Sequence, residues 1–318
     1  MKTKRLKLKT ENACIDAKSA KRSKREKRVI IVLFLAIPLL LLLFFTYKPL
    51  CDMFYWSFFN KRLASPRKEY AQFDNYLNIF KRTEYISVLK VSLYYMVGSF
   101  VQIALAVYLA TVFAFKMKGK NFFKGVLFFP SLLNGVAIGF MFIFFFERGG
   151  ALDTILCALG CDQESLPKWL GQANIVNISL TFVSVWRYMG QNMVLFSGAT
   201  QSIGTEYFEA AELDGANKWQ QFRYLIFPGI KSVVMLNLIL AVKGSLQVYE
   251  VPKIITNGLF GSTTFVMKIL DTAFAKNQYG FACALGVALL ILTLVITGIQ
   301  KLFFERDERK ERKGNKAI

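Results

Sequence analysis

The chain lacks histidine entirely: none occurs among its 318 residues. Histidine is the commonest metal ligand and titrates nearest to neutral pH, so its absence argues against a metal-dependent or acid–base enzyme. No G-x-x-x-x-G-K-[ST] phosphate-binding loop is present, so the chain has neither the backbone cradle nor the lysine of that motif. Cysteine is scarce, and the five cysteines show no metal-type pairing.

Hydrophobic residues, in contrast, are abundant. They make up 54% of the chain, which contains 31 phenylalanines, and this content is too high for a soluble domain of such length. The net charge of +20 does not indicate a nucleic-acid partner, because the basic residues cluster beside apolar segments, where membrane proteins place them. The composition predicts a single all-α domain in a lipid bilayer.

Six segments have the roughly 20 apolar residues that a helix needs to cross the hydrocarbon core. They cover about residues 29–47, 88–115, 125–146, 175–199, 232–249 and 278–300. The first follows a basic tail, residues 1–28, and is expected to remain as a helix rather than to be cleaved as a signal peptide. The membrane domain is expected to span residues 29–305, and a second charged tail covers residues 306–318.

The distribution of lysine and arginine predicts that both termini are cytoplasmic. In that orientation the inside segments hold 26 of these residues and the outside segments hold 12, which is the asymmetry of the positive-inside rule. The 116–124 segment shows the bias most cleanly, with four lysines and no acid. The 200–231 loop is then cytoplasmic. Cys157 and Cys161 lie in an external loop, where free thiols are expected and a local disulfide is the alternative.

The 200–231 loop carries local signals for two short helices joined by a turn. Residues 206–213 are rich in helix formers, and Gly215 is expected to stop that helix, because glycine tolerates left-handed backbone. Asn217 and Gln220 have the spacing of a capping box for the second helix. Pro228 is expected to separate this helix from the fifth span. The second helix should present one apolar stripe, formed by Trp219, Phe222, Leu225 and Ile226.

This loop resembles the coupling loop of ABC importer permeases, which passes the movement of a separate ATPase to the translocation path. The signature of that loop is Glu-Ala-Ala, then Asp-Gly-Ala, then an aromatic or aliphatic run that ends in proline. The matching positions are Glu209, Ala210, Ala211, Asp214, Gly215, Ala216, Phe222 and Pro228. On the residues alone, an amphipathic elbow at the membrane surface without a partner is the alternative.

The resemblance covers about residues 29–305 and is to the carbohydrate and glycerol-phosphate branch, specifically to the maltose-permease-like six-span subunit. It also includes FDNY (73–76), FFPSLLNGVAIG (128–139), WLG (169–171) and ITNG (255–258). It implies the type I importer permease (MetI-like) fold, with N-in/C-in orientation in a plasma or inner membrane of bacterial type.

The resemblance also implies partners rather than cofactors. It points to a second homologous permease, two ABC ATPase subunits and an extracytoplasmic solute-binding protein. ATP would be bound by the partner ATPase, because no phosphate-binding loop occurs in this chain. The chain is accordingly expected to be a transporter subunit and not an enzyme, with no cofactor and no metal of its own.

A substrate path is expected around Arg187 and Lys243, because charges inside membrane spans are functional candidates by default. The resemblance implies Ser131, Gly135, Ser184, Arg187, Tyr188, Gln191, Ser245 and Val248 as cavity positions. Four neighbours offer further aromatic, amide or cationic groups: Trp186, Lys243, Gln247 and Tyr249. Two cations would suit an anionic or uronic-acid-containing sugar. The alternative is that both are structural charges, paired with Glu250 or with a partner subunit.

Three other functions were weighed against that of a carbohydrate permease. A secondary transporter predicts inverted repeats with matching broken spans, and no such repeat is evident. A membrane enzyme would need clustered carboxylates or a metal site, which the sequence does not offer. A subunit that contacts the ATPase but not the solute remains open, because the loop signature alone does not distinguish it.

Overall fold

The computed structural model describes residues 27, 30–62, 65, 67–115 and 117–314, and the chain divides into two compact units, residues 1–56 and 57–318. The first unit is one apolar helix that begins at Ile30, contains a π-helical turn at Leu43–Tyr47 and continues as α2 (Lys48–Ser57). It contains the described part of the first predicted span, residues 29–47, and continues to Ser57. The predicted basic tail, residues 1–28, falls almost entirely outside the described residues.

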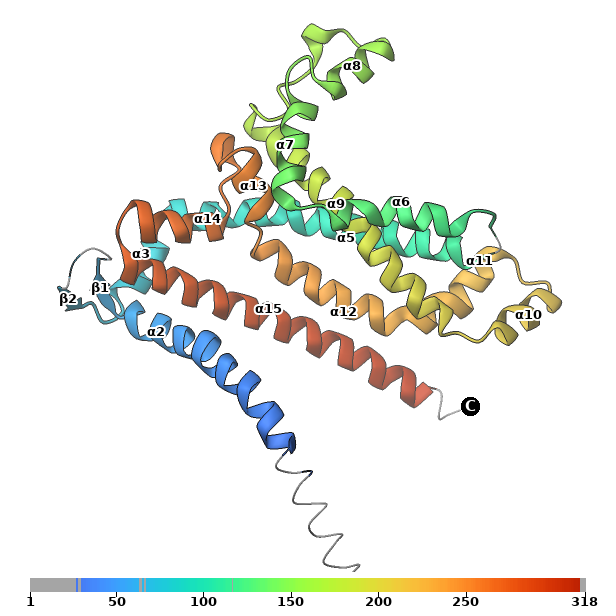
Figure 1. Ribbon diagram of the computed structural model, residues 1–318, viewed down its shortest axis with the longest axis horizontal. Helices are drawn as coiled ribbons and strands as arrows, with labels where there is room; N and C mark the ends of the chain where they lie inside the picture. The colour runs from blue at the N-terminus through green and yellow to red at the C-terminus, as the bar shows by residue number, and fades with distance from the viewer. Residues whose placement is uncertain (1–26, 28–29, 63–64, 66, 116, 315–318) are drawn as a thin grey trace, which may run out of the picture. The chain divides into compact units, whose positions relative to one another are not determined.

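The second unit begins with a small hairpin and then consists of helices (Figure 1). Strands β1 (Phe59–Lys61) and β2 (Lys68–Tyr70) are antiparallel, with Phe59 opposite Tyr70. The long helices are α5 (Leu89–Ala114), α6 (Lys120–Leu132), α7 (Gly135–Phe146), α9 (Ala173–Gln201), α12 (Phe227–Leu246) and α15 (Tyr279–Gly314). The short elements are α3 (Asp74–Lys81), α4 (Thr83–Ser87), α8 (Ala151–Ala158), α10 (Thr205–Leu213), α11 (Lys218–Gln221), α13 (Glu250–Ile255) and α14 (Phe265–Leu270), with 3₁₀ turns at Gln163–Ser165 and Leu259–Gly261 and π turns at Phe222–Ile226 and Asp271–Ala275.

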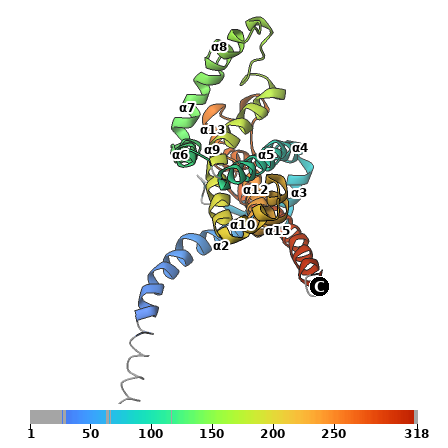
Figure 2. The ribbon, with the colours of Figure 1, turned by 90° about the vertical axis from the view of Figure 1, so that its right-hand side faces the viewer.

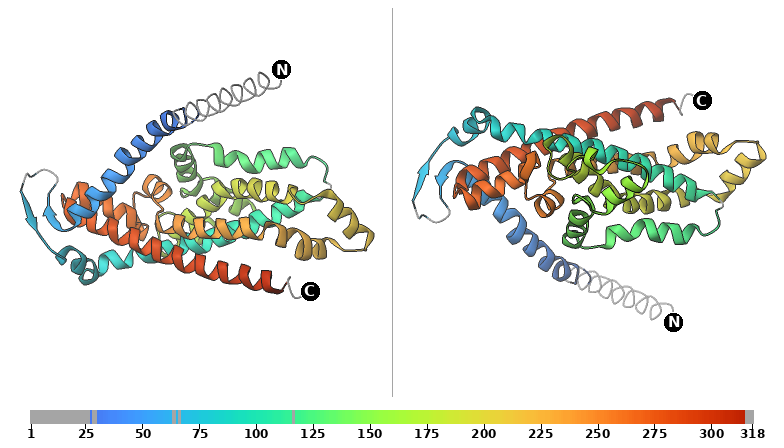
Figure 3. Two further views of the ribbon diagram at one scale, coloured as in Figure 1. Left: turned by 90° about the horizontal axis from the view of Figure 1, so that it is seen from below. Right: turned by 90° about the horizontal axis from the view of Figure 1, so that it is seen from above.

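The long helices other than α7 form a bundle in which α9 contacts α5, α6 and α12, and α12 contacts α15. Helices α10 and α11 lie at one end of the bundle, and the hairpin with α3 lies at the other end (Figures 1 and 3). Helices α7 and α8 project away from the bundle (Figure 2). The 116–124 and 200–231 segments, both predicted to be cytoplasmic, therefore meet at the same end.

Four described helices are long and apolar enough to cross a membrane: Ile30–Ser57, Thr83–Ala114, Lys218–Ile255 and Tyr279–Phe304. The expected third span, residues 125–146, is instead a pair of helices, α6 and α7, bent by 98°. The bend follows Pro130 and is fixed by Asn134, whose side chain accepts the Val136 N–H at 2.8 Å and so starts a new helix. Counted as one span, the pair gives five.

Helix α9 accounts for the fourth predicted span, residues 175–199, although its polar residues lower its hydropathy. At 29 residues it is long enough to cross the hydrocarbon core. Its buried face carries Val176, Leu180, Val183, Arg187 and Gly190 at helical spacing. A β-carbon at Gly190 would overlap the backbone of Leu127 in α6, so this glycine sets how closely the two helices approach. The fold is therefore compatible with six spans.

Two smaller expectations concern the end of the chain and the cysteines. Helix α15 continues to Gly314, so the backbone of the predicted 306–318 tail extends the sixth span as a helix over most of its length. Cys157 and Cys161, in and just after α8, are both free thiols. The structure contains no disulfide between these two cysteines, so the alternative of a local disulfide is wrong.

Candidate functional site

The 200–231 loop folds into an elbow, defined here as residues 205–221, which comprises α10, a turn and α11. The turn is of Schellman type: the Gly215 N–H donates to Glu212 O at 3.1 Å, and the Ala216 N–H donates to Ala211 O at 2.9 Å. Gly215 has a φ of +76°, which residues with a side chain rarely adopt. The first helix and its glycine stop occur where the sequence predicted them.

The second arm of the elbow begins with the predicted capping box. The Gln220 N–H donates to Asn217 Oδ1 at 2.9 Å, and the Asn217 N–H donates to Gln220 Oε1 at 2.8 Å. From there the helix continues without a break into α12 through the π turn, in which the Phe227 N–H donates to Phe222 O. Pro228 lies in the first turn of α12, at the predicted boundary before the fifth span, but the helix is not interrupted there.

The outer surface of the elbow is apolar and open. Leu213 is 90% exposed, Trp219 69% and Tyr207 60%. Trp219 stacks against Phe222 with ring centres 5.4 Å apart, but Phe222 is half-buried and Trp219 is not, so the predicted apolar stripe turns only partly inward. Ala210 is exposed beside Glu209. Exposed apolar groups around small residues favour contact with another protein.

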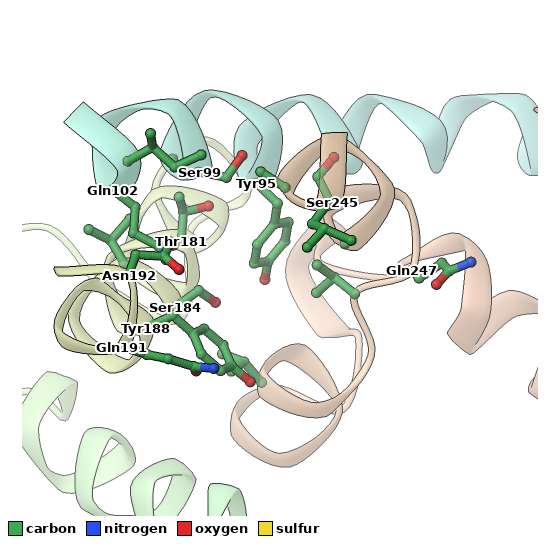
Figure 4. Close-up of a pocket in the computed structure, with 18 of the residues that line it drawn as sticks. Tyr95, Ser99, Gln102, Thr181, Ser184, Tyr188, Gln191, Asn192, Ser245 and Gln247 are labelled. Atoms are coloured by element: carbon green, nitrogen blue, oxygen red, sulfur yellow. The ribbon is translucent and has the colours of Figure 1, made fainter. Parts of the chain in front are cut away.

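A second candidate site is a cavity of about 550 Å³ in the middle of the bundle, within the size range of small-molecule sites. Its walls come from α5, α9, α12 and the break between α12 and α13 (Figure 4). Six residues of the predicted substrate path line it: Ser184, Tyr188, Gln191, Ser245, Gln247 and Tyr249. Val248, a cavity position that the resemblance implied, also lines it.

Two hydroxyl groups in this cavity have no hydrogen-bond partner in the part of the chain that the structure describes. They are the Tyr95 hydroxyl and Thr181 Oγ1, both buried, and both residues line the cavity. Figure 4 shows Tyr95 pointing from α5 toward the space between α9 and α12. Buried polar groups are nearly always hydrogen-bonded, so these two are available to a polar occupant.

Five residues of the predicted path do not line the cavity: Ser131, Gly135, Trp186, Arg187 and Lys243. The Ser131 hydroxyl donates to Phe128 O in its own helix at 2.6 Å. Trp186 packs edge-on against Phe142 of α7, with ring centres 5.2 Å apart. The Lys243 side chain is exposed on α12 and forms no ion pair with any described residue. The expected pair of cations is therefore absent from the cavity.

Arg187 instead forms an ion pair with Glu250, the first residue of α13, with Nη1 and Oε2 2.7 Å apart. The guanidinium also lies 5.0 Å from the centre of the Tyr188 ring. A β-carbon at Gly135 would overlap Glu250 Oε1 and would lie 2.8 Å from Arg187 Nη1. Gly135, Arg187 and Glu250 thus form one junction of α7, α9 and α13, and only the Glu250 side of the pair lines the cavity.

The contribution of α5 to the cavity was not predicted from the sequence. Tyr95, Ser99 and Gln102 line the cavity, and they recur at the spacing of one helical face in a span that is otherwise mostly apolar. This spacing could have been used to predict, from the sequence alone, that the three residues face a polar cavity. Asn192 and Asn237, which also line the cavity, carried no comparable pattern, because their roles depend on how α9 and α12 cross.

Comparison with known proteins agrees with this architecture. Residues 102–307 match the family model described as "Binding-protein-dependent transport system inner membrane component". The probable ABC transporter permease protein YurN of Bacillus subtilis is 32% identical over 88% of this chain and 97% of its own length. The multiple sugar-binding transport system permease protein MsmF of Streptococcus mutans is 29% identical over 84% of this chain and 92% of its own length.

Among solved structures, a bacterial alginate ABC transporter in complex with an alginate pentasaccharide-bound periplasmic protein contains a chain with the same fold. The TM-score is 0.78 at 18% identity, over 88% of this chain and 96% of that one. The fold is therefore that of an ABC importer permease, and the family model and the relatives identify a multi-pass transporter subunit, not an enzyme. The match over residues 102–307, together with the 32% identity to a permease along nearly its whole length, shows that this chain belongs to the binding-protein-dependent transport system inner membrane component family.

Proposed function

We propose that the chain is the permease subunit of a carbohydrate importer and that the sugar passes through the cavity between α5, α9 and α12. The observation that carries this proposal is the pair of unpartnered hydroxyls, Tyr95 and Thr181, in the lining of that cavity. Sugars offer many hydroxyl groups, and a hydroxyl both donates and accepts. The amides of Gln102, Gln191 and Asn192 in the same lining add donors and acceptors for further sugar hydroxyls.

The charge of the cavity favours an uncharged sugar. No lysine or arginine is among its lining residues, and Glu250 is the only acid there. Since Glu250 is paired with Arg187, the pair adds no net charge. An acidic sugar would bring a carboxylate into a low-dielectric site without a free counter-ion, which is costly. We therefore replace the anionic substrate suggested by the sequence with a neutral one.

The relatives support the carbohydrate class. MsmF is described as part of a multiple sugar-binding transport system, and other permeases that match over at least four fifths of this chain are described as serving diacetylchitobiose uptake and arabinooligosaccharide transport. The alginate transporter with the same fold was solved with a periplasmic protein. By analogy, we infer that an extracytoplasmic binding protein delivers the sugar to this chain.

The elbow would connect sugar passage to ATP hydrolysis in a separate ATPase. Its exposed residues Leu213, Trp219 and Tyr207 offer an apolar contact surface, and Glu209 offers a carboxylate for a basic group of the partner. Because α11 continues into α12 without a break, movement of the elbow would be transmitted to a helix that lines the cavity. A second homologous permease would complete the path.

Co-purification tests this role. The tagged chain, expressed with its candidate ATPase, should retain that ATPase, and Glu209→Lys combined with Gly215→Trp should reduce retention at least about tenfold, which corresponds to about 1.4 kcal/mol. Glu164→Lys makes the same charge change in the predicted external loop and should have no effect. Retention that the elbow variant leaves intact would refute the coupling role of residues 205–221.

A further inference from the structure

A second cavity, of about 810 Å³, lies between the elbow and the bundle. Its walls come from the end of α5, the start of α6, the end of α9 and both arms of the elbow. It shares no lining residue with the cavity proposed for sugar. It is at the end of the bundle predicted to be cytoplasmic, where α10 and α11 lie (Figure 3). Neither the elbow's contact with an ATPase nor sugar passage explains it.

Three lysines line this cavity without an acidic partner in the described part of the chain: Lys120, Lys124 and Lys218. Lys124 Nζ donates to the Ser197 hydroxyl at 2.5 Å and lies 5.8 Å from the centre of the Phe113 ring. Lys218 Nζ lies 5.4 Å from the centre of the Phe115 ring. These contacts hold the ammonium groups of Lys124 and Lys218 near the end of α5, and no described carboxylate forms an ion pair with them.

The start of α6 adds a further positive feature to the same cavity. Gly119 precedes the helix and has no side chain to cap it, and the first two residues of α6, Lys120 and Asn121, line the cavity. Free N–H groups at a helix N-terminus bind anions, and the helix dipole strengthens the effect. The three lysine side chains and the uncapped N-terminus of α6 therefore line the same cavity.

The other polar side chains of the lining carry oxygen atoms that can accept hydrogen bonds from hydroxyl groups. Gln221 is 4% exposed; its Nε2 donates to Ala216 O at 3.0 Å, while its Oε1 is buried without a partner in the described structure. Glu209 and Glu212 also line the cavity. These three side chains offer acceptor oxygens, which match the hydroxyl donors of a ligand and not its anionic group.

We propose that this cavity binds a phosphate ester that also carries hydroxyl groups. The phosphate would be held by Lys120, Lys124 and Lys218, and the hydroxyls would donate to Gln221 and to the Glu212 carboxylate, while Glu209 remains available to the ATPase. Two sources share this chemistry: the headgroup of phosphatidylglycerol in the cytoplasmic leaflet, and a soluble glycerol phosphate. The bound ligand would join α6 to α11 and so restrain the elbow.

The test uses the purified full-length chain and treats the two sources separately. Native mass spectrometry counts lipids retained from an equal mixture of phosphatidylglycerol and phosphatidylcholine, and equilibrium dialysis measures binding of labelled sn-glycerol 3-phosphate. One of these two ligands should bind selectively. Lys124→Gln with Lys218→Gln should weaken that binding at least about tenfold, since two charge-assisted hydrogen bonds are lost.

Three control variants keep the test decisive. Lys118→Gln removes one lysine charge from the segment that holds Lys124, but Lys118 does not line the cavity, so this variant should leave binding unchanged, as should Lys124→Arg with Lys218→Arg. Gln221→Leu should weaken binding of glycerol phosphate but not of inorganic phosphate, and it leaves the lysines in place if their double variant fails to fold. Equal retention of both lipids with no glycerol phosphate bound, or the same loss in Lys118→Gln, would overturn the proposal.

Discussion

At the scale of single residues, the junction of Gly135, Arg187 and Glu250 explains how an arginine is kept inside the bundle. Arg187 is buried, with only 11% of its side chain exposed, and an unpaired charge at that depth is costly. Glu250 supplies the counter-charge, and the missing side chain of residue 135 supplies the space for its carboxylate. A glycine on a third helix is therefore a condition for the ion pair.

Gly135→Ala should break this pair and lower stability by roughly 1–3 kcal/mol, since the new β-carbon displaces the carboxylate from a buried guanidinium. Thermal unfolding of the purified chain in detergent measures the loss. Gly125→Ala is the matched control, because nothing lies within 4 Å of its β-carbon position, and it should be neutral or slightly stabilising. Equal unfolding temperatures for the two variants would contradict the role of Gly135.

Asp153, outside the predicted spans, gives a pH-dependent prediction. Its buried carboxylate accepts the Trp169 indole N–H at 2.8 Å and the Gly149 N–H at 2.8 Å, and these bonds lower the pKa of Asp153. A lowered pKa means that the stabilisation is present above the unfolded value of about 4 and is lost as the pH falls through the folded pKa.

The wild type should therefore be more stable than Asp153→Asn at pH 7, and the difference should shrink as the pH is lowered below about 4. Thermal unfolding followed by Trp fluorescence across that pH range measures it. A stability difference that stays constant down to pH 3 would show that the ionised carboxylate is not what holds the loop between α7 and α9.

At the scale of elements, the elbow and the α6–α7 bend show which features a sequence reveals. The turn at Gly215 and the capping box at Asn217 depend on residues within five positions of each other, so the sequence predicted both correctly. The bend lies in an unbroken apolar run, and its local signals, Pro130 and Asn134, were outweighed by hydropathy. The sequence did not predict the π turn at Phe222–Ile226. Pro228 is also typical of the first turn of an ordinary helix, so it gave no separate signal for a π turn.

The capping box should matter to the elbow more than to the bundle. Asn217→Ala removes an acceptor for the Gln220 N–H, which costs about 1 kcal/mol, and should speed hydrogen exchange of the amides in α11. Asn217→Asp keeps an acceptor oxygen, so the amides of α11 should exchange at the wild-type rate in this variant. The amides of α5, which is distant from Asn217 in sequence, should exchange at the wild-type rate in both variants. Unchanged α11 exchange in Asn217→Ala would mean that tertiary contacts, not the cap, hold the arm.

At the scale of the whole molecule, the cavity is assembled from three spans that are distant in sequence. The resemblance implied Ser184, Tyr188, Gln191 and Ser245, and Gln247 and Tyr249 were identified as neighbours of Lys243. All six line the cavity. Which way Arg187 and Lys243 face depends on helix packing, and no local pattern encodes that. Because neither side chain lines the cavity, we propose a neutral sugar in place of the anionic sugar suggested by the sequence.

ATP-driven uptake into proteoliposomes is the most direct test of the proposal that this chain itself contacts the transported sugar. The complete importer would be reconstituted with its binding protein, and uptake of labelled neutral oligosaccharides compared between wild type and Tyr95→Phe combined with Gln191→Leu. Losing two hydrogen-bonding groups should lower uptake about tenfold, with assembly and ATPase retention unchanged. Uptake at the wild-type rate would contradict the claim and would leave the chain as a coupling subunit that does not contact the solute.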